Sequence, residues 1–327
     1  MEIVLSILGG LGLFLFAVSR LGETMHSLMG ERSKKLIGKF VRNTFTAVLT
    51  GLIVTILLDS SSAVIILTIV LVNANVLTFR QAMGIVIGAN IGTTFSSQLI
   101  ALDVGKFSPI PIIVGLFMAF FTKNENLSHG AKAILYFGIL FFGLFTMERA
   151  VEPLRNDAYF SNIMASLDNR FAGAGAGAFV TLVIQSSSAT VGIVITFAKK
   201  GLIALPGALA VMLGAELGTC ADTLLATIKS NKQALKTGLF HLTFNITSIM
   251  LGLLCFPWFV ALVEYISGTA NLEQKVANGH IMFNVMGALL FLPLISPMEK
   301  LLNKLVPDKK GDVHQLDPFA DDYPAEA

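Results

Sequence analysis

Charged residues are scarce in this chain. They make up 13% of the 327 residues, where soluble domains carry about 25%. Hydrophobic residues make up 54%, and the mean hydropathy is +0.75. The only two cysteines, Cys220 and Cys255, lie in apolar segments, which argues against a disulfide framework. The net charge of +2 gives no indication of nucleic-acid binding. This composition indicates a chain embedded in a lipid bilayer.

Apolar stretches recur along the chain, and a spanning helix needs roughly 20 mostly apolar residues. We expect seven spans, of which the third is short for a crossing: 3–21, 79–101, 108–122, 131–149, 203–228, 237–265 and 280–305. No basic segment precedes the first span, so we expect it to be retained rather than cleaved. Residues 23–43 are polar and basic, which predicts an interfacial helix. The composition of residues 306–327 predicts a disordered cytoplasmic tail.

Two short polar stretches interrupt the apolar runs: D-S-S-S-A at residues 59–63 and Q-S-S-S-A at 185–189. The apolar arm before the first triplet has 15 residues and the arm after it has 10, about 22 and 15 Å of helix. Neither arm crosses a hydrocarbon core of about 30 Å. Irregular backbone at that depth is tolerated only inside protein or beside a watery cavity. We therefore predict re-entrant hairpins whose serine tips lie inside the helix bundle.

The two tips belong to an internal duplication with a shift of 126 residues. Residues 50–101 align with 176–227 without a gap, with 14 identities in 52 positions. The identities cluster at the triplets and at G-A-N-I-G-T (88–93), which aligns with G-A-E-L-G-T (214–219). Three full spans separate the starts of the two copies, and an odd number inverts the second copy. We predict an all-α polytopic membrane protein of two inverted repeats, each with a re-entrant helical hairpin and a broken transmembrane helix.

We call residues 1–126 unit 1, and residues 127–305, which include a final helix, unit 2. If both hairpins return to the side from which they entered, 16 basic residues fall on one side and 7 on the other. The positive-inside rule then places the N-terminus outside and the C-terminus in the cytoplasm of a cell (inner) membrane. Inverted repeats with polar groups at mid-membrane are typical of secondary transporters.

The serine tips fit an anion site. A helix that begins at Ser60, Ser61 and Ser62 presents free backbone N–H groups and the positive end of its dipole. The same hydroxyls also suit a small hard cation. Single serines in membrane helices usually bond to the preceding turn or allow close packing, but two identical triplets in duplicated hairpins favour binding.

The glycine segments carry a side-chain oxygen between their glycines, at Asn90 and Glu216, and a threonine beyond, at Thr93 and Thr219. Glycine weakens a helix by about 1 kcal/mol, so local unwinding would free carbonyl groups for Na⁺. Helix packing explains the glycines equally well, but it does not explain Glu216.

Three acidic residues, Asp59, Glu216 and Asp222, lie in apolar segments without a basic neighbour in sequence. An ionised carboxylate at the bilayer centre costs roughly 2.5–3.5 kcal/mol. Bound Na⁺, protonation and an aqueous path are the alternatives that would offset this cost.

The sequence H-L-T-F-N, from His241 to Asn245, recurs as H-I-M-F-N, from His280 to Asn284. A spacing of four residues places each His and Asn on one helical face. These residues either support the site from behind or form interhelical hydrogen bonds.

Together, the duplicated Q-S-S-S hairpin, G-A-N-I-G-T-T and H-x-x-F-N-I resemble the type II sodium-dependent phosphate cotransporters over about residues 1–305. The resemblance implies movement of inorganic phosphate coupled to several Na⁺. By motif, it implies phosphate and Na⁺ sites lined by Ser60, Ser61, Ser62, Gln185, Ser186, Ser187 and Ser188. It implies further Na⁺ ligands at Asn90, Thr93, Thr94 and Thr219. The chain departs from the family pattern at Asp59, where Gln is usual, and at Glu216, where Asn is usual.

The sequence therefore predicts a Na⁺-coupled phosphate symporter that works by alternating access in membrane lipid, as a monomer or a homodimer. No cofactor is expected besides Na⁺, and Asp59, Glu216 and Asp222 join the predicted Na⁺ ligands. The alternatives are another small oxyanion, phosphate export, a passive channel or an intramembrane serine hydrolase with His241 or His280 as its base. Because nothing resembles G-x-S-x-G, we do not expect an enzyme.

Overall fold

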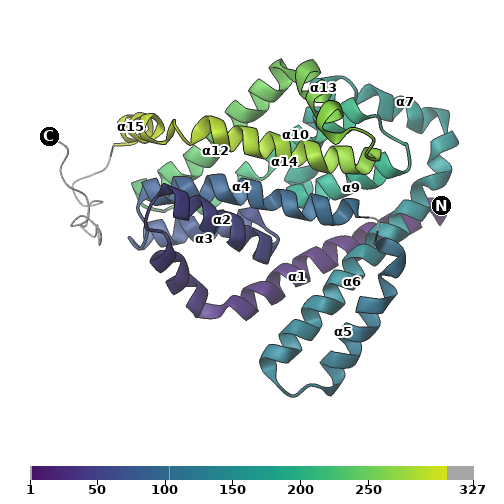
Figure 1. The fold of residues 1–327 in the computed structure, drawn as a ribbon, viewed down its shortest axis with the longest axis horizontal. Coiled ribbons are helices and arrows are strands. Elements are labelled where there is room, and N and C mark those ends of the chain that lie inside the picture. Colours follow the sequence, from purple (N-terminus) through teal and green to yellow (C-terminus); the bar gives the residue numbers. More distant parts are fainter. Residues whose placement is uncertain (1, 103, 308–327) are drawn as a thin grey trace.

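A computed structural model describes residues 2–102 and 104–307, and these residues form helices and connecting turns without strands (Figure 1). Four helical segments are long and apolar enough to cross a membrane, or up to six if each of two bent pairs is one span. The all-α prediction is confirmed, and the apolar helices agree with a multi-pass membrane protein. Inversion of the repeats and re-entrance of the hairpins remain predictions. Residues 308–327 of the predicted tail lie outside the described residues.

The helices follow one another with short turns. The first half of the chain contains α1 (Glu2–Phe40), α2 (Thr44–Leu58), α3 (Ser61–Asn73), α4 (Phe79–Ala101), η1 (Gly105–Phe107) and α5 (Pro109–Phe121). The second half begins with α6 (Glu125–Val151), η2 (Glu152–Asn156), α7 (Ala158–Ser166), α8 (Arg170–Ile184) and α9 (Ser187–Lys199). It continues with α10 (Leu205–Gly218), α11 (Cys220–Ala226), α12 (Lys232–Leu254), α13 (Phe256–Ser267), α14 (Leu272–Phe291) and α15 (Ile295–Leu305).

The serine triplets turn the chain between α2 and α3, which we call hairpin 1, and between α8 and α9, which we call hairpin 2. The residues before the triplets, Asp59 and Gln185, adopt the left-handed conformation, with φ of 53° and 59°. The next residues, Ser60 and Ser186, are extended and accept a hydrogen bond from the backbone N–H three positions later, at 3.2 and 3.1 Å. The two tips therefore share one backbone turn. A left-handed residue other than glycine is strained, and such strain clusters at functional sites.

Each hairpin packs through glycine against the helix that follows it, α2 against α4 and α8 against α10. A Cβ atom on Gly88 would meet the carbonyl oxygen of Val48, and one on Gly214 would meet that of Ala174. Positions 48 and 174 are themselves 126 residues apart, so the two contacts are the same contact repeated. These glycines allow two backbones to approach closely.

The predicted break at residues 88–93 is wrong for unit 1, where α4 continues unbroken from Phe79 to Ala101. The polar side chains of this segment bond within their own helix. The Asn90 amide donates to the Val86 carbonyl at 2.9 Å, and the Thr93 hydroxyl to the Ala89 carbonyl at 3.1 Å. In unit 2 the regular helix is interrupted at one residue, since α10 ends at Gly218 and α11 starts at Cys220, but Thr219 keeps helical dihedral angles and Leu205–Ala226 is long and apolar enough to be one span.

Three other boundaries differ from expectation. No separate helix covers residues 23–43, since α1 continues to Phe40. The predicted span 237–265 is two helices, with Pro257 in the first turn of α13, and the predicted span 280–305 bends by 74° between α14 and α15. Pro293 lies at that bend. Proline cannot donate to the preceding turn, so both breaks have a local cause.

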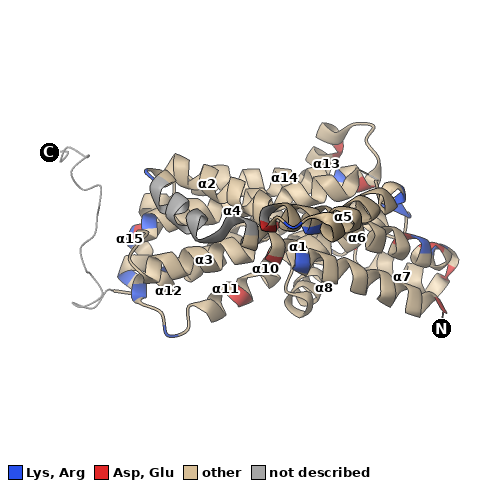
Figure 2. Ribbon diagram, turned by 90° about the horizontal axis from the view of Figure 1, so that it is seen from below, with Lys and Arg blue, Asp and Glu red and all other residues tan. Residues whose placement is uncertain are grey.

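The buried apolar residues form three clusters. One joins hairpin 1 and α4 to α12 and α15, a second joins hairpin 2 and α10 to α12–α14, and the third lies between α1 and α6. The α5–α6 pair projects from the rest of the molecule (Figure 1). Lysine and arginine gather toward the two ends of the elongated molecule, and most of the ribbon between them is uncharged (Figure 2).

Candidate functional site

The tips of both hairpins line one cavity of about 400 Å³, which we call the tip cavity. Its wall includes Asp59, Thr219 and the seven residues that the resemblance assigned to phosphate: Ser60, Ser61, Ser62, Gln185, Ser186, Ser187 and Ser188. One face of α1 completes the wall with Leu15, Val18, Ser19, Gly22 and Glu23. Two segments 126 residues apart in sequence therefore meet at one place.

The tip cavity receives the N-terminal ends of two helices, α3 and α9, each of 13 residues. The first N–H groups of an α-helix have no partner within the helix. Among the hydrogen bonds of the described residues, none uses the backbone N–H of Ser61, Ser62, Ser187 or Ser188. These donors and the neighbouring hydroxyls are available to an anion, and the helix dipoles favour negative charge there.

Among the described side chains, the lining of the tip cavity contains two carboxylates, Asp59 and Glu23, and neither lysine nor arginine. Glu23 pairs with Arg20 at 2.7 Å, and both side chains are exposed. Asp59 accepts a hydrogen bond from the hydroxyl of Ser96 on α4. An anion in this cavity would find donors but no protein cation, whereas the carboxylate and hydroxyl oxygens suit a hard cation.

The positions of Asp59 and Ser96 correspond to Gln185 and Asp222 in unit 2 by the shift of 126 residues, but only Asp59 and Ser96 are joined by a hydrogen bond among the described residues. Each unit thus has one carboxylate and one neutral polar residue at this pair of positions. The carboxylate precedes the serine triplet in unit 1, whereas in unit 2 it lies at the later position. Asp222 lies half-buried on α11 and does not line the tip cavity.

Of the other predicted Na⁺ ligands, only Thr219 is among the described residues that line the tip cavity. Asn90, Thr93, Thr94 and Glu216 are buried and do not line the tip cavity. The Thr94 hydroxyl donates to the Ile91 carbonyl at 2.7 Å. Thr219 lines the tip cavity while its hydroxyl donates to the Glu216 carbonyl at 2.9 Å.

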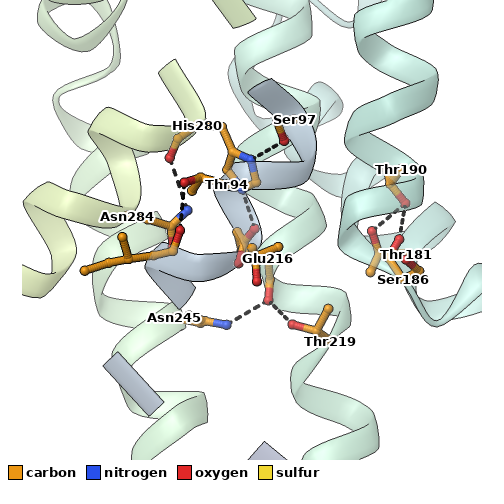
Figure 3. A network of polar contacts seen from close by, with 12 residues as sticks. Thr94, Ser97, Thr181, Ser186, Thr190, Glu216, Thr219, Asn245, His280 and Asn284 are labelled. Atoms are coloured by element: carbon orange, nitrogen blue, oxygen red, sulfur yellow. Dashed lines mark hydrogen bonds and ion pairs between the residues drawn. The ribbon is translucent and has the colours of Figure 1, made fainter. Parts of the chain in front are cut away.

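Glu216 belongs to a buried network that joins three helices (Figure 3). Its carboxylate lies 2.8 Å from His280 Nε2 on α14, and His280 Nδ1 lies 2.7 Å from the Ser97 hydroxyl on α4. Ser, His and Glu are the residue types of a hydrolase triad, but each of these three is at most 1% exposed. None lines the tip cavity, so no substrate space adjoins this serine.

The two H-x-x-F-N helices take repeat-related places. His241 Nδ1 on α12 lies 2.8 Å from the Thr223 hydroxyl, as His280 lies near Ser97, and positions 97 and 223 are 126 residues apart. Helix α12 packs against α3 and α11, and α14 packs against α9 and α4. Both histidines therefore form interhelical contacts, which agrees with the structural interpretation of this motif.

The asparagines of this motif are also buried. The Asn245 amide donates to the Glu216 carbonyl at 2.8 Å (Figure 3). It also contacts His241 Nε2 at 3.1 Å. The Asn284 amide donates to the His280 carbonyl at 3.2 Å. None of the four His and Asn residues lines the tip cavity.

Hairpin 2 carries a hydroxyl chain that hairpin 1 lacks. The Thr181 hydroxyl donates to the Thr190 hydroxyl at 2.8 Å, which donates to the Ser186 carbonyl at 3.1 Å (Figure 3). In hairpin 1 the corresponding residues are Thr55 and Val64, and the buried Thr55 hydroxyl has no hydrogen-bond partner.

Sequence reasoning missed the α1 wall and Ser96. The signals were weak: Ser19 and Glu23 lie one helical turn apart at the end of the first apolar run, and Ser96 follows G-A-N-I-G-T-T by two residues. Neither pattern reveals which distant segment the side chain faces.

Several known proteins have sequences similar to that of this chain. An uncharacterised protein of Bacillus subtilis (strain 168), YqeW, is 29% identical over 298 residues, 90% of this chain and 96% of that protein. The Escherichia coli (strain K12) protein YjbB, named for inorganic phosphate export, is 25% identical over 318 residues, 96% of this chain and 58% of that protein. The human sodium-dependent phosphate transport protein 2B is 30% identical over 98 residues, 29% of this chain and 14% of that protein.

No solved structure matches the chain significantly. The family model described as Na⁺/Pi-cotransporter matches twice in succession, over residues 13–149 and 145–291. Each match contains one serine triplet. Because the two matches together extend from residue 13 to residue 291, this chain belongs to the Na⁺/Pi-cotransporter family.

Proposed function

We propose that this chain carries inorganic phosphate across a membrane together with Na⁺, by alternating access. Family membership and the names of its relatives support phosphate as the substrate and point to a transporter rather than an enzyme. Coupling to Na⁺ is our own inference from the site.

The observation that carries the proposal is the meeting of both serine tips in one cavity. A phosphate ion there would accept hydrogen bonds from the free N–H groups at the starts of α3 and α9 and from the triplet hydroxyls. Donors from both units on one ion would couple the position of each hairpin to binding. Preorganised backbone donors at helix N-termini are a recurring way to hold phosphate.

The charge of the tip cavity supports cation coupling. Glu23 is already paired with Arg20, but phosphate beside the Asp59 carboxylate is unfavourable until a cation offsets its negative charge. Asp59 with Ser96 is our first Na⁺ site, and the repeat-related Gln185 with Asp222 marks a second. Inward movement of each Na⁺ would contribute about 2.3 kcal/mol per 100 mV of membrane potential.

The lengths of the hairpin arms support re-entrance. Helices α2 and α8 have 15 residues, and α3 and α9 have 13, about 22 and 20 Å, each shorter than a hydrocarbon core of about 30 Å. The two hairpins then enter from opposite faces, with the N-terminus outside and the C-terminus in the cytoplasm. Alternating access follows if the faces open in turn around fixed tips.

The test is uptake of radiolabelled phosphate by proteoliposomes across an imposed Na⁺ gradient, repeated at two pH values. We expect uptake that requires Na⁺ and falls at least tenfold in Gln185→Ala or Ser187→Ala, because both residues line the tip cavity. Asp168→Asn is the matched control, since this carboxylate caps the Gly207 N–H away from the cavity. Uptake that persists when choline replaces Na⁺ contradicts the coupling.

A second candidate keeps the fold but changes the direction or the cargo. The name of YjbB favours export, and Asp59 in place of the family's Gln favours a different oxyanion. Comparison of inside-out with right-side-out vesicles decides the direction. If Asp59→Gln creates phosphate transport where the native chain has none, the native substrate is another anion.

A further inference from the structure

A second cavity, of about 190 Å³, adjoins the tip cavity and shares Val18, Asp59 and Ser188 with it. Its walls come from α1, α2, α4 and α6, and from Asp59 and Ser188 at the tips of the two hairpins. We call it the phenylalanine cavity. The proposed phosphate transport gives it no role.

Four phenylalanine side chains line this cavity, Phe14 on α1, Phe95 on α4, and Phe137 and Phe141 on α6. The rings of Phe137 and Phe141 lie 4.8 Å apart between centroids. The remaining wall is mostly leucine, isoleucine, valine and methionine. Phe95 is 43% exposed, which places the cavity near the apolar outer surface of the helix bundle.

The polar side chains of the phenylalanine cavity are Asp59, Ser96 and Ser188. Asp59 accepts the Ser96 hydrogen bond, and among the side chains that the structure describes no lysine or arginine lines the cavity to offset the carboxylate charge. Aromatic faces carry negative electrostatic potential and attract cations. The Asp59 carboxylate and the phenylalanine rings therefore favour a bound cation over a bound anion.

The size and polarity of the phenylalanine cavity further restrict the kind of ligand that it can bind. A bare Na⁺ gains little from apolar walls, because it needs oxygen ligands on several sides. A dry apolar cavity of about 150 Å³ holds one benzene molecule, so this cavity admits an apolar group slightly larger than a phenyl ring. A neutral hydrocarbon of that size would leave Asp59 without a cationic partner.

We propose that the phenylalanine cavity binds a small lipophilic organic cation, with its ammonium group at Asp59 and its apolar body among the phenylalanine rings. This site does not depend on phosphate as the transported substrate. Because Asp59 also lines the tip cavity, the bound ammonium group would exclude Na⁺ from that carboxylate.

The test is equilibrium dialysis of radiolabelled benzyltrimethylammonium against the full chain in lipid nanodiscs, in potassium buffer without phosphate. Protein-free nanodiscs measure partition into lipid. We expect saturable binding of one molecule per chain, weakened at least tenfold by Asp59→Asn. Phe95→Leu keeps an apolar side chain at a half-exposed position but removes one ring, and we expect it to weaken binding about threefold.

Asp168→Asn is the matched control, because it removes a carboxylate that lines neither cavity and accepts a hydrogen bond from the Gly207 N–H. We expect its affinity to stay within twofold of the native chain. Unaltered affinity in both Asp59→Asn and Phe95→Leu overturns the proposal, as does binding no greater than in protein-free nanodiscs. The second result is the one expected if a lipid acyl chain fills the cavity. Failure of Na⁺-driven phosphate uptake leaves these measurements unaffected, since they use neither phosphate nor a gradient.

Discussion

At the tip of hairpin 2, the hydroxyls of Thr181 and Thr190 bond to each other and then to the Ser186 carbonyl, so the tip is tied within its own hairpin. At the tip of hairpin 1, Val64 replaces the second threonine, Thr55 is left without a partner, and Asp59 is tied instead to Ser96 on α4. The backbone turn is nevertheless the same in both hairpins.

Some features of the two tips follow from the sequence that they share, and others do not. The shared S-S-S-A sequence supplies the N-cap that starts the next helix, and the left-handed turn before it forms with either Asp59 or Gln185. The residues that hold the tip in place differ between the units. Such a difference gives the two halves of one cavity unequal stiffness and unequal charge, although they share a fold.

The largest expected effect contrasts the two buried histidines. His280→Leu removes the partner of the Glu216 carboxylate and should lower the free energy of unfolding by about 3–5 kcal/mol, because that carboxylate stays buried without a partner. His241→Leu should cost about 1–3 kcal/mol, since Asn245 keeps its bond to the Glu216 carbonyl. Denaturant unfolding in a mild detergent measures both, and equal losses would contradict the contrast.

A second contrast uses the hydroxyl chain. Thr190→Val leaves the buried Thr181 hydroxyl without its partner and should destabilise the chain by about 1–3 kcal/mol. Thr55→Val removes a hydroxyl that already lacks a partner, so it should be neutral or stabilising. The same unfolding measurement applies, and a cost in Thr55→Val as large as in Thr190→Val would show that the two tips are held alike.

The exchanged carboxylates provide a functional contrast. Asp59→Gln gives hairpin 1 the residue of hairpin 2 and should raise the Na⁺ concentration for half-maximal phosphate uptake about tenfold, since the cation loses a charged ligand. Adding Ser96→Asp places the carboxylate where unit 2 has Asp222 and should recover most of the loss. If the single variant has native Na⁺ dependence, Asp59 is not a Na⁺ ligand.

The smallest expected effect is a gain. Val64→Thr supplies hairpin 1 with the hydroxyl that hairpin 2 has at Thr190, so the Thr55 hydroxyl acquires a partner. We expect stabilisation by about 1 kcal/mol or less in thermal unfolding. Ile65→Thr, at a buried position next in sequence, is the control and should destabilise. A lower unfolding temperature in Val64→Thr would contradict the expected bond.

The hairpin tips were predictable because their signal is local and occurs twice. The triplets, the following alanines and the arm lengths together specify a helix–turn–helix unit without any distant contact. By contrast, G-A-N-I-G-T fits both unwinding and close packing. The deciding fact is the Val48 backbone against Gly88, which lies on another helix. Local sequence contains no information about that approach.

The breaks at Pro257 and Pro293 had a signal in the sequence that our expected spans 237–265 and 280–305 did not use, since proline interrupts a helix wherever it falls beyond the first turn. The wall formed by α1 and the bond from Ser96 to Asp59 had no such signal. Both depend on how α1 and α4 pass the tip of hairpin 1, and the residues involved are ordinary members of apolar helices. Side chains that act across helices need the packed structure to be found.

Equilibrium binding of phosphate to the full chain in nanodiscs, in Na⁺ and in choline buffer, tests the shared tip cavity most directly. In Na⁺ buffer we expect phosphate to bind, with an affinity that falls at least tenfold in Ser61→Ala and, separately, in Ser187→Ala. In choline buffer we expect no phosphate binding. Native affinity after removal of either hydroxyl, or equal affinity in choline, would contradict a phosphate site built from both hairpins.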